Sequence, residues 1–265
     1  MTTLSRCCSG LVCSLLLLAL AVPSHAQSTS FSPVVHVDVV TGYNTFDMTE
    51  SSTFFRQVVD VYRDQNLDMR VQQSYPGNVR YGADVRLDLQ RWLSVGVGTR
   101  YSRTQAASLY GDIAGTVDIL SKTNLWTLTP LVRVEWPHGP IHPFLSGRGG
   151  LVRGRYSINE VVAIDPEALD LLPADVEVDP EDLRSKSTLD ASGTGWTATA
   201  MAGLRVPVGR LSLLLQGGHR WAYVDRPDAD GRTNGEEAFT GALPFTVEYS
   251  GWTVDLGASL RLFGP

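Results

Sequence analysis

Cysteine is almost absent from this chain of 265 residues. Its three cysteines, Cys7, Cys8 and Cys13, all lie close to the N-terminus, in a segment that we expect to be removed during export. The rest of the chain therefore has no disulfide, no cysteine-ligated zinc site and no thiol nucleophile. Its stability has to come from packing or from burial in lipid.

Long apolar runs are missing beyond the N-terminal segment. No later stretch approaches the roughly 18 apolar residues that indicate a transmembrane helix. The chain is therefore either soluble or crosses a membrane with β-strands, whose hydropathy signal is weaker. Positive charge is in deficit too, with 28 acidic against 22 basic residues and a net charge of −6. This balance argues against a general nucleic-acid-binding protein.

The N-terminus has the pattern of an export signal. Arg6 and the free amine are weakly positive, residues 11–22 are apolar, Pro23 breaks the run, and residues 24–26 form a small-x-small cleavage site. This pattern predicts a secretory signal peptide over residues 1–26 that is cleaved after Ala26. The apolar run is too short for a spanning helix, which needs about 20 residues. Residues 27–265 then form one β-barrel domain.

Eight segments alternate between apolar and polar residues. In the clearest, 79–90, Val85 and Leu87 point one way while Arg86 and Asp88 point the other, because successive strand residues face opposite sides. The other seven are 35–43, 93–101, 126–135, 145–151, 196–206, 211–223 and 252–262. The connections alternate between long and short, which predicts an eight-stranded antiparallel up-and-down barrel. A soluble periplasmic barrel remains an alternative, since alternation alone does not exclude it.

The polar face is rich in charge, which favours a transmembrane barrel with ionic groups inside and apolar groups against lipid. In so narrow a lumen we expect glycines to relieve crowding and opposite charges, for example Asp84 and Arg86, to pair. The predicted lumen network consists of Asp38, Arg80, Asp84, Arg86, Asp88, Arg100, Arg133, Glu135, Arg148, Arg205, Asp255 and Arg261.

The connections divide into two sets. The short ones are 91–92, 136–141 and 207–210, and the long ones are 44–78, 103–123, 155–194 and 224–248. If the N-terminus starts in the periplasm, all long loops are extracellular, as is usual for such barrels. Within the first, apolar spacing predicts a short amphipathic helix over 49–64 that acts as a lid on the barrel mouth or docks on lipid or a partner. The acidic stretch at 165–182 is a solvated loop or a weak divalent-cation site.

Aromatic residues gather toward the strand ends that the long loops join. These residues are Tyr43, Tyr81, Tyr101, Trp126, Trp196, Trp221, Tyr223 and Trp252. An aromatic girdle at a membrane interface has this placement, although β-propensity alone also enriches strands in aromatics.

Three segments resemble the OmpA/OmpW-type family of small eight-stranded outer-membrane barrels: 143–150 (PFLSGRGG), 201–206 (MAGLRV) and 256–263 (LGASLRLF). The resemblance implies outer-membrane lipid and lipopolysaccharide as surroundings, and the barrel-assembly machinery as a partner that reads the closing strand. Two features depart from the family pattern. Gly264 and Pro265 follow Phe263, and Pro130 interrupts a strand, which predicts a bulge or a shifted strand boundary.

No catalytic residue, cofactor or metal site is predicted. The similar lipid A deacylases have a His and a Ser two residues apart, but here the residue two beyond His219 is Trp221, so the serine nucleophile is missing. We expect His219 to be an interfacial side chain among aromatics. His36 and Asp38 form either an acid–base pair or a lumen-filling polar contact.

The sequence thus favours an integral outer-membrane protein with a structural or surface-binding role through its long extracellular loops. The alternatives are a narrow conduit for small or apolar solutes and a lipid A-modifying enzyme. The extracellular ligand stays open.

Overall fold

A computed structural model describes residues 33–64, 67, 69–73, 75–112, 115–165 and 183–263. The predicted signal peptide, most of the acidic stretch at 165–182 and the final two residues lie outside this part of the chain. The elements in chain order are β1 (Val34–Asn44), α2 (Thr49–Asp64), β2 (Arg70–Gln73), β3 (Asn78–Gln90), β4 (Leu93–Asp112), β5 (Gly115–Glu135), β6 (His142–Ile164), β7 (Arg184–Val208), β8 (Leu211–Val224), β9 (Asp228–Thr233), β10 (Glu236–Ala242), β11 (Val247–Glu248) and β12 (Gly251–Phe263).

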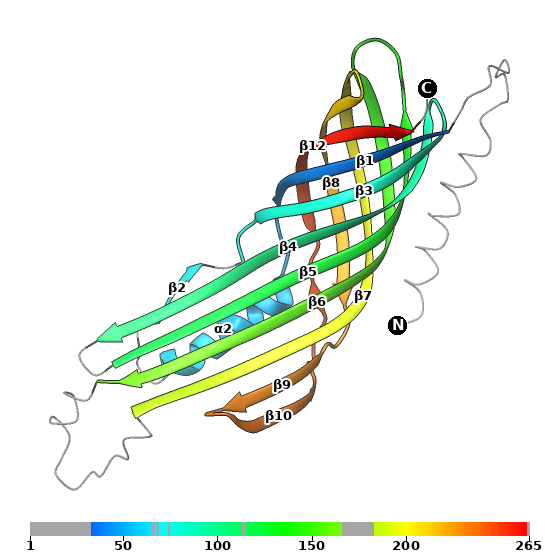
Figure 1. Ribbon diagram of the computed structural model, residues 1–265. Helices are drawn as coiled ribbons and strands as arrows, with labels where there is room; N and C mark the ends of the chain where they lie inside the picture. Colours follow the sequence, from blue (N-terminus) through cyan, green and yellow to red (C-terminus); the bar gives the residue numbers. More distant parts are fainter. Residues whose placement is uncertain are drawn as a thin grey trace, which may run out of the picture. The chain divides into compact units, whose positions relative to one another are not determined.

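Eight of the strands close into a ring (Figure 1). The order is β1, β3, β4, β5, β6, β7, β8 and β12, and β12 returns to β1; every neighbouring pair is antiparallel. The predicted eight-stranded barrel is confirmed. No helix in the described part of the chain is long and apolar enough to cross a bilayer.

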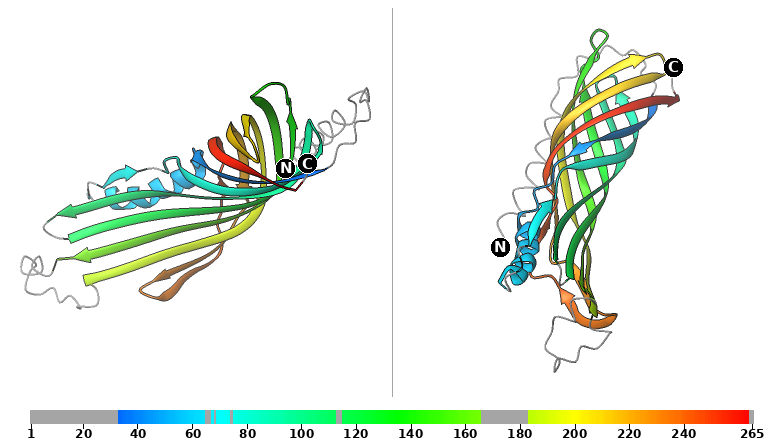
Figure 2. Two further views of the ribbon diagram at one scale, coloured as in Figure 1. Left: turned by 45° about the horizontal axis from the view of Figure 1, so that its top comes forward. Right: turned by 90° about the vertical axis from the view of Figure 1, so that its left-hand side faces the viewer.

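Strands β4 to β7 are much longer than the sequence suggested. They have 20, 21, 23 and 25 residues, whereas a tilted strand needs about 9–11 to cross a membrane. Figures 1 and 2 show them continuing past the ends of β1, β3 and β12 as one curved sheet, which we call the extension. The predicted long loop over 103–123 is therefore wrong, since β4 and β5 pair through to Asp112 and Gly115. The predicted loop over 155–194 is likewise strand at both ends.

Short elements widen the extension on both sides. The part of β7 that lies in the ring, Trp196–Val208, pairs with β8. The part that lies in the extension, Ser187–Ser192, pairs instead with β9. The hairpin β9–β10 then lies where the sequence predicted only loop. On the other edge β2 pairs with β4.

The helix lies where apolar spacing predicted it, over Thr49–Asp64. Its Phe55 and Val59 are buried in an apolar cluster with residues from β5 and β6, among them Ile119 and Tyr156. The Tyr62 hydroxyl also donates to a Glu160 carboxylate oxygen on β6. The helix therefore packs on the inner face of the extension, which fits the lid interpretation better than docking on lipid.

Pro130 causes neither the predicted bulge nor a strand end. The β5–β6 register is the same before it (Leu128 opposite Leu151) and after it (Leu131 opposite Arg148), and only the pairing in between is interrupted. Gly150 lies beside this gap, where a Cβ would lie 2.4 Å from the Leu128 carbonyl oxygen and 3.3 Å from the proline ring. Glycine at position 150 thus lets β6 run close beside β5 next to the proline, and β5 continues although Pro130 has no N–H to donate.

Candidate functional site

The barrel is built with its apolar residues outward. Val85, Leu213 and Leu256 are 51%, 62% and 60% exposed, while Arg86 is 1% exposed in the lumen. A soluble barrel would have the opposite arrangement, because it hides apolar side chains from water. This inside-out arrangement is that of a transmembrane β-barrel.

Two ionic groups fill the part of the lumen nearest the short turns. At the end of β5, Glu135 Oε1 accepts hydrogen bonds from Arg205 Nε (2.9 Å) and lies 2.8 Å from His142 Nδ1. Further in, Asp38 Oδ2 accepts from Arg86 Nε at 2.9 Å and lies 3.3 Å from an Arg133 nitrogen. These contacts fix Arg86 and Arg205, two of the predicted lumen residues, in the interior.

Two predicted pairings are wrong. Arg86 does not pair with Asp84 but with Asp38 and Asp88. His36 does not pair with Asp38; its Nε2 lies 3.0 Å from Asp88 Oδ2. In each case the partner is set by which strands adjoin and by their register, and not by spacing within one strand. The lumen-filling interpretation of His36 holds, with a different partner.

A third group centres on Asp84. Its two carboxylate oxygens accept hydrogen bonds from both Arg100 (2.6 and 2.8 Å) and Arg148 (both 2.7 Å). Gly98 makes room for this carboxylate, since a Cβ there would lie 1.8 Å from Asp84 Oδ1. Gly82 does the same for Arg100 Cδ, at 2.2 Å. Both positions show why the lumen-facing strands carry glycine.

The last group lies toward the extension. Asp255 accepts from Arg80 Nε at 2.6 Å and from Gln216 Nε2 at 2.9 Å. Closer to the extension, Arg220 donates to the Tyr249 carbonyl at 2.8 and 3.1 Å, and its guanidinium lies over the Phe46 ring. Gln216 and Arg220 were not among the predicted lumen residues, although both follow the same alternation. Arg261, which was predicted, is only half-buried at the turn end.

Beyond the ionic groups, on the side of the extension, the interior becomes apolar. The Tyr75 hydroxyl bonds to Ser121 (2.6 Å) and Tyr156 (3.1 Å), and beyond them lies the cluster that α2 covers. Burial raises the pKa of Tyr75, and of Tyr156, above the ordinary value for tyrosine. The lumen is thus filled along its length by paired charges, and then closed by packed apolar side chains.

The aromatic girdle forms where it was predicted, at the extension end of the barrel wall. The ring centroids of Tyr101 and Trp126 lie 4.9 Å apart with the rings tilted, as do those of Trp196 and Tyr223. The His219 ring lies 4.7 Å from that of Trp221 and 5.2 Å from that of Trp252. His219 is thus an interfacial side chain among aromatics.

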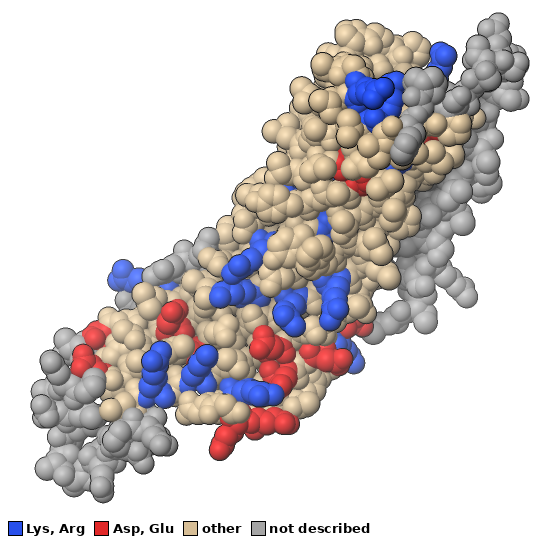
Figure 3. Space-filling view, in the orientation of Figure 1, with Lys and Arg blue, Asp and Glu red and all other residues tan. Residues whose placement is uncertain are grey.

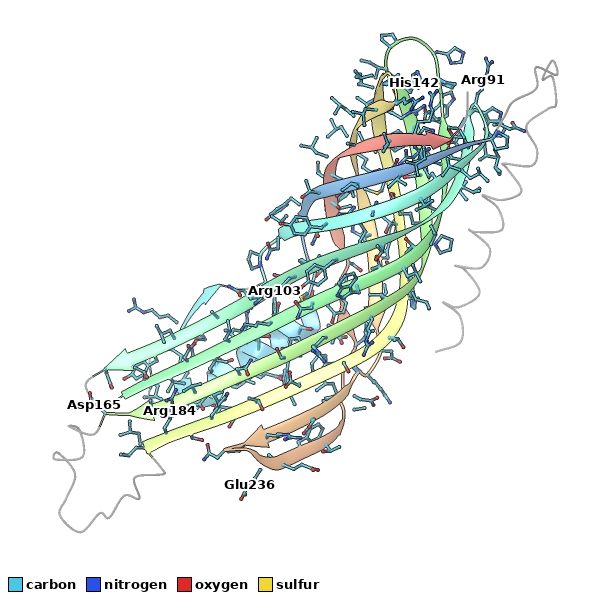
Figure 4. The ribbon with its side chains drawn as sticks, viewed as in Figure 1. Arg91, Arg103, His142, Asp165, Arg184 and Glu236 are labelled. Atoms are coloured by element: carbon cyan, nitrogen blue, oxygen red, sulfur yellow. The ribbon has the colours of Figure 1, made fainter. Side chains whose placement is uncertain are left out.

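The outer face of the extension is polar. In Figure 3 the barrel wall is mostly uncharged, and Lys and Arg side chains gather across the middle of the face at the level of Arg103, which Figure 4 labels. Near the β9–β10 hairpin a cleft of about 470 Å³ is lined by residues that include Arg155, Asp190 and Asp228. The described residues contain no cluster of His, Cys, Asp and Glu suited to a metal ion.

No protein-family model and no curated protein sequence matches the chain. Among solved structures, a major outer membrane protein from Thermus thermophilus is 12% identical with a TM-score of 0.48, covering 87% of this chain and 100% of that one. Neisserial surface protein A is 10% identical with a TM-score of 0.38, covering 86% and 97%. The Escherichia coli outer membrane protease OmpT is 7% identical with a TM-score of 0.33, covering 91% and 100%. Each of these likenesses concerns the fold alone.

Proposed function

We propose that this protein is a non-enzymatic outer-membrane protein whose barrel is a sealed anchor and whose extension is a preformed binding surface outside the cell. The observation that carries the proposal is the filled interior. Five acidic side chains, Asp38, Asp84, Asp88, Glu135 and Asp255, hold arginines across the lumen, and the core under α2 covers them. A solute would have to break several buried ion pairs, so the conduit alternative loses support.

The extension supports the binding half of the proposal. A long loop pays an ordering cost when it binds a partner, whereas strands that already pair and pack do not. The hairpin β9–β10 and the outer faces of β4 to β7 offer exposed polar and charged residues on such a rigid scaffold. Outer-membrane lipid, lipopolysaccharide and the barrel-assembly machinery are the partners we propose, and no nucleic acid.

Orientation can be tested with single cysteines, because all native cysteines lie in the predicted signal peptide. Glu236 and Arg91 are exposed and lie at opposite ends of the described molecule (Figure 4). We expect a membrane-impermeant maleimide to label Glu236→Cys in intact cells and to label Arg91→Cys only after lysis. The parent protein is the control and should stay unlabelled. Labelling of Arg91→Cys but not of Glu236→Cys in intact cells would reverse the topology and end the proposal.

A conductance measurement tests whether the lumen is closed to ions. We expect the purified protein in planar bilayers to give a conductance close to that of the bare bilayer, because paired charges and an apolar core fill the lumen. A gel of unboiled and boiled samples checks that the barrel is folded and inserted, since folded barrels migrate anomalously until boiled. Reproducible open-channel steps from folded protein would favour the conduit function instead.

A further inference from the structure

Four basic residues form a compact patch on the outer face of the extension. The patch adjoins the aromatic girdle on the side away from the short turns. They are Arg103 on β4, Lys122 on β5, and Arg153 and Arg155 on β6. Arg103 lies opposite Asn124, Asn124 lies opposite Arg155, and Trp126 of the girdle lies opposite Arg153. Side chains opposite each other across antiparallel strands have Cβ atoms about 5 Å apart, so the four cations surround Asn124.

The patch is rich in donors, and acidic side chains adjoin it at Arg155, which lines a cleft with Asp190, Asp228 and Asp230. Within the part of the chain that the structure describes, none of the four cations makes an ion pair or a side-chain hydrogen bond. The Tyr101 hydroxyl donates to Asn124 Oδ1 at 3.1 Å, so the central amide oxygen already accepts a hydrogen bond, and the amide N–H groups are further donors. Four cations and an amide donor suit a ligand that is negatively charged and rich in oxygen acceptors.

The position of the patch indicates where that ligand resides. Along β6, Arg155 and Arg153 are followed by Leu151, Gly149 and Gly147, all on the outward face. A Cβ on Gly147 would meet nothing within 4 Å. The barrel wall between the cations and the short turns is therefore smooth and faces lipid. The charged groups thus lie at headgroup level, with room for acyl chains beneath them.

We propose that Arg103, Lys122, Asn124, Arg153 and Arg155 bind the phosphate groups of a phosphorylated glycolipid in the outer leaflet, of the lipid A type. The acyl chains of that lipid lie along the wall at Gly147 and Gly149. Acidic side chains limit the site on one side, since Arg155 lies opposite Ser192, and Ser192 lies opposite Asp228. This inference rests on the proposed membrane orientation and adds a specific lipid site to it.

The test is native mass spectrometry of the folded protein in detergent, titrated with bisphosphorylated lipid A and with dephosphorylated lipid A of the same acyl chains. We expect the phosphorylated lipid to bind at least roughly tenfold more tightly to the wild type. The quadruple variant R103Q/K122Q/R153Q/R155Q should lose that preference. Asn124→Asp should lose most of it too, because it places a carboxylate of the same shape among the cations.

A matched control, R91Q/R184Q/K186Q/R210Q, removes the same charge elsewhere. All four positions are exposed; Arg91 and Arg210 lie in short turns, and Arg184 and Lys186 lie at the start of β7. This variant should keep the preference. Equal losses in the control, an unchanged quadruple variant, or complete displacement of the lipid by millimolar inorganic phosphate would each overturn the site. Gel mobility before boiling and the cysteine labelling report separately on the membrane orientation, so failure of the lipid site is distinguishable from failure of the proposed function.

Discussion

Asp84→Ala should lower the free energy of unfolding by about 3–5 kcal/mol. The Asp84 carboxylate, which is 1% exposed, is the shared acceptor for Arg100 and Arg148. Its removal leaves two buried guanidinium groups facing each other without their counter-ion, and such uncompensated buried charge is costly. Reversible unfolding in urea from lipid vesicles, followed by tryptophan fluorescence, measures the loss.

The chain offers a matched control in the same chemistry. Asp60 pairs with Arg63 at 3.0 Å on the surface of α2, where the two side chains are 55% and 45% exposed. Exposed pairs contribute about 0–1 kcal/mol, so Asp60→Ala should change stability little. Asp84→Asn should fall between the two, because an amide keeps the shape and part of the acceptor capacity but not the charge. Equal effects of Asp84→Ala and Asp60→Ala would mean that water, and not the carboxylate, stabilises the two arginines.

The sequence was sufficient for the barrel ring but not for the extension, and β5 shows why. Within the membrane its apolar residues are outward, at Trp126 and Leu128, whereas above the membrane they are inward, at Val117, Ile119 and Leu125. The same strand therefore changes the parity of its apolar positions between Leu125 and Trp126. A search for one continuous apolar face ends the strand there and assigns the rest to a loop.

The sequence was sufficient to predict on which side of its strand each residue lies, but not which residue it forms an ion pair with. Alternation with a period of two placed Asp38, Asp84 and Arg86 on one side of their strands, and all three are buried in the lumen. Their pairing depends on the register between strands, which puts Asp84 opposite Asp38 and Arg86 opposite His36. The ion pairs then form diagonally and across further strands, information that a single sequence does not contain.

Phe55→Ala in α2 should release the extension while leaving the barrel folded. The Phe55 side chain is 1% exposed and its ring lies 6.3 Å from that of Tyr75 in the core under the helix. Truncating a buried phenylalanine costs about 3–5 kcal/mol, equivalent to roughly 100-fold or more in the population of the open extension. Protease added outside intact cells should therefore cut the variant much faster than the wild type.

The control for that experiment lies on the same helix. Val61 is 58% exposed, so Val61→Ala removes apolar surface without opening the core and should leave cleavage unchanged. The barrel of the Phe55→Ala variant should still migrate anomalously before boiling, because its lumen is held by ion pairs that the helix does not touch. If Phe55→Ala and Val61→Ala were cut at the same rate, the helix would not hold the extension closed, and docking on lipid or on a partner would become the better interpretation of α2. If cleavage rose only in the Phe55→Ala variant, the extension would be a unit that folds on top of the barrel, stabilised by an apolar core of its own.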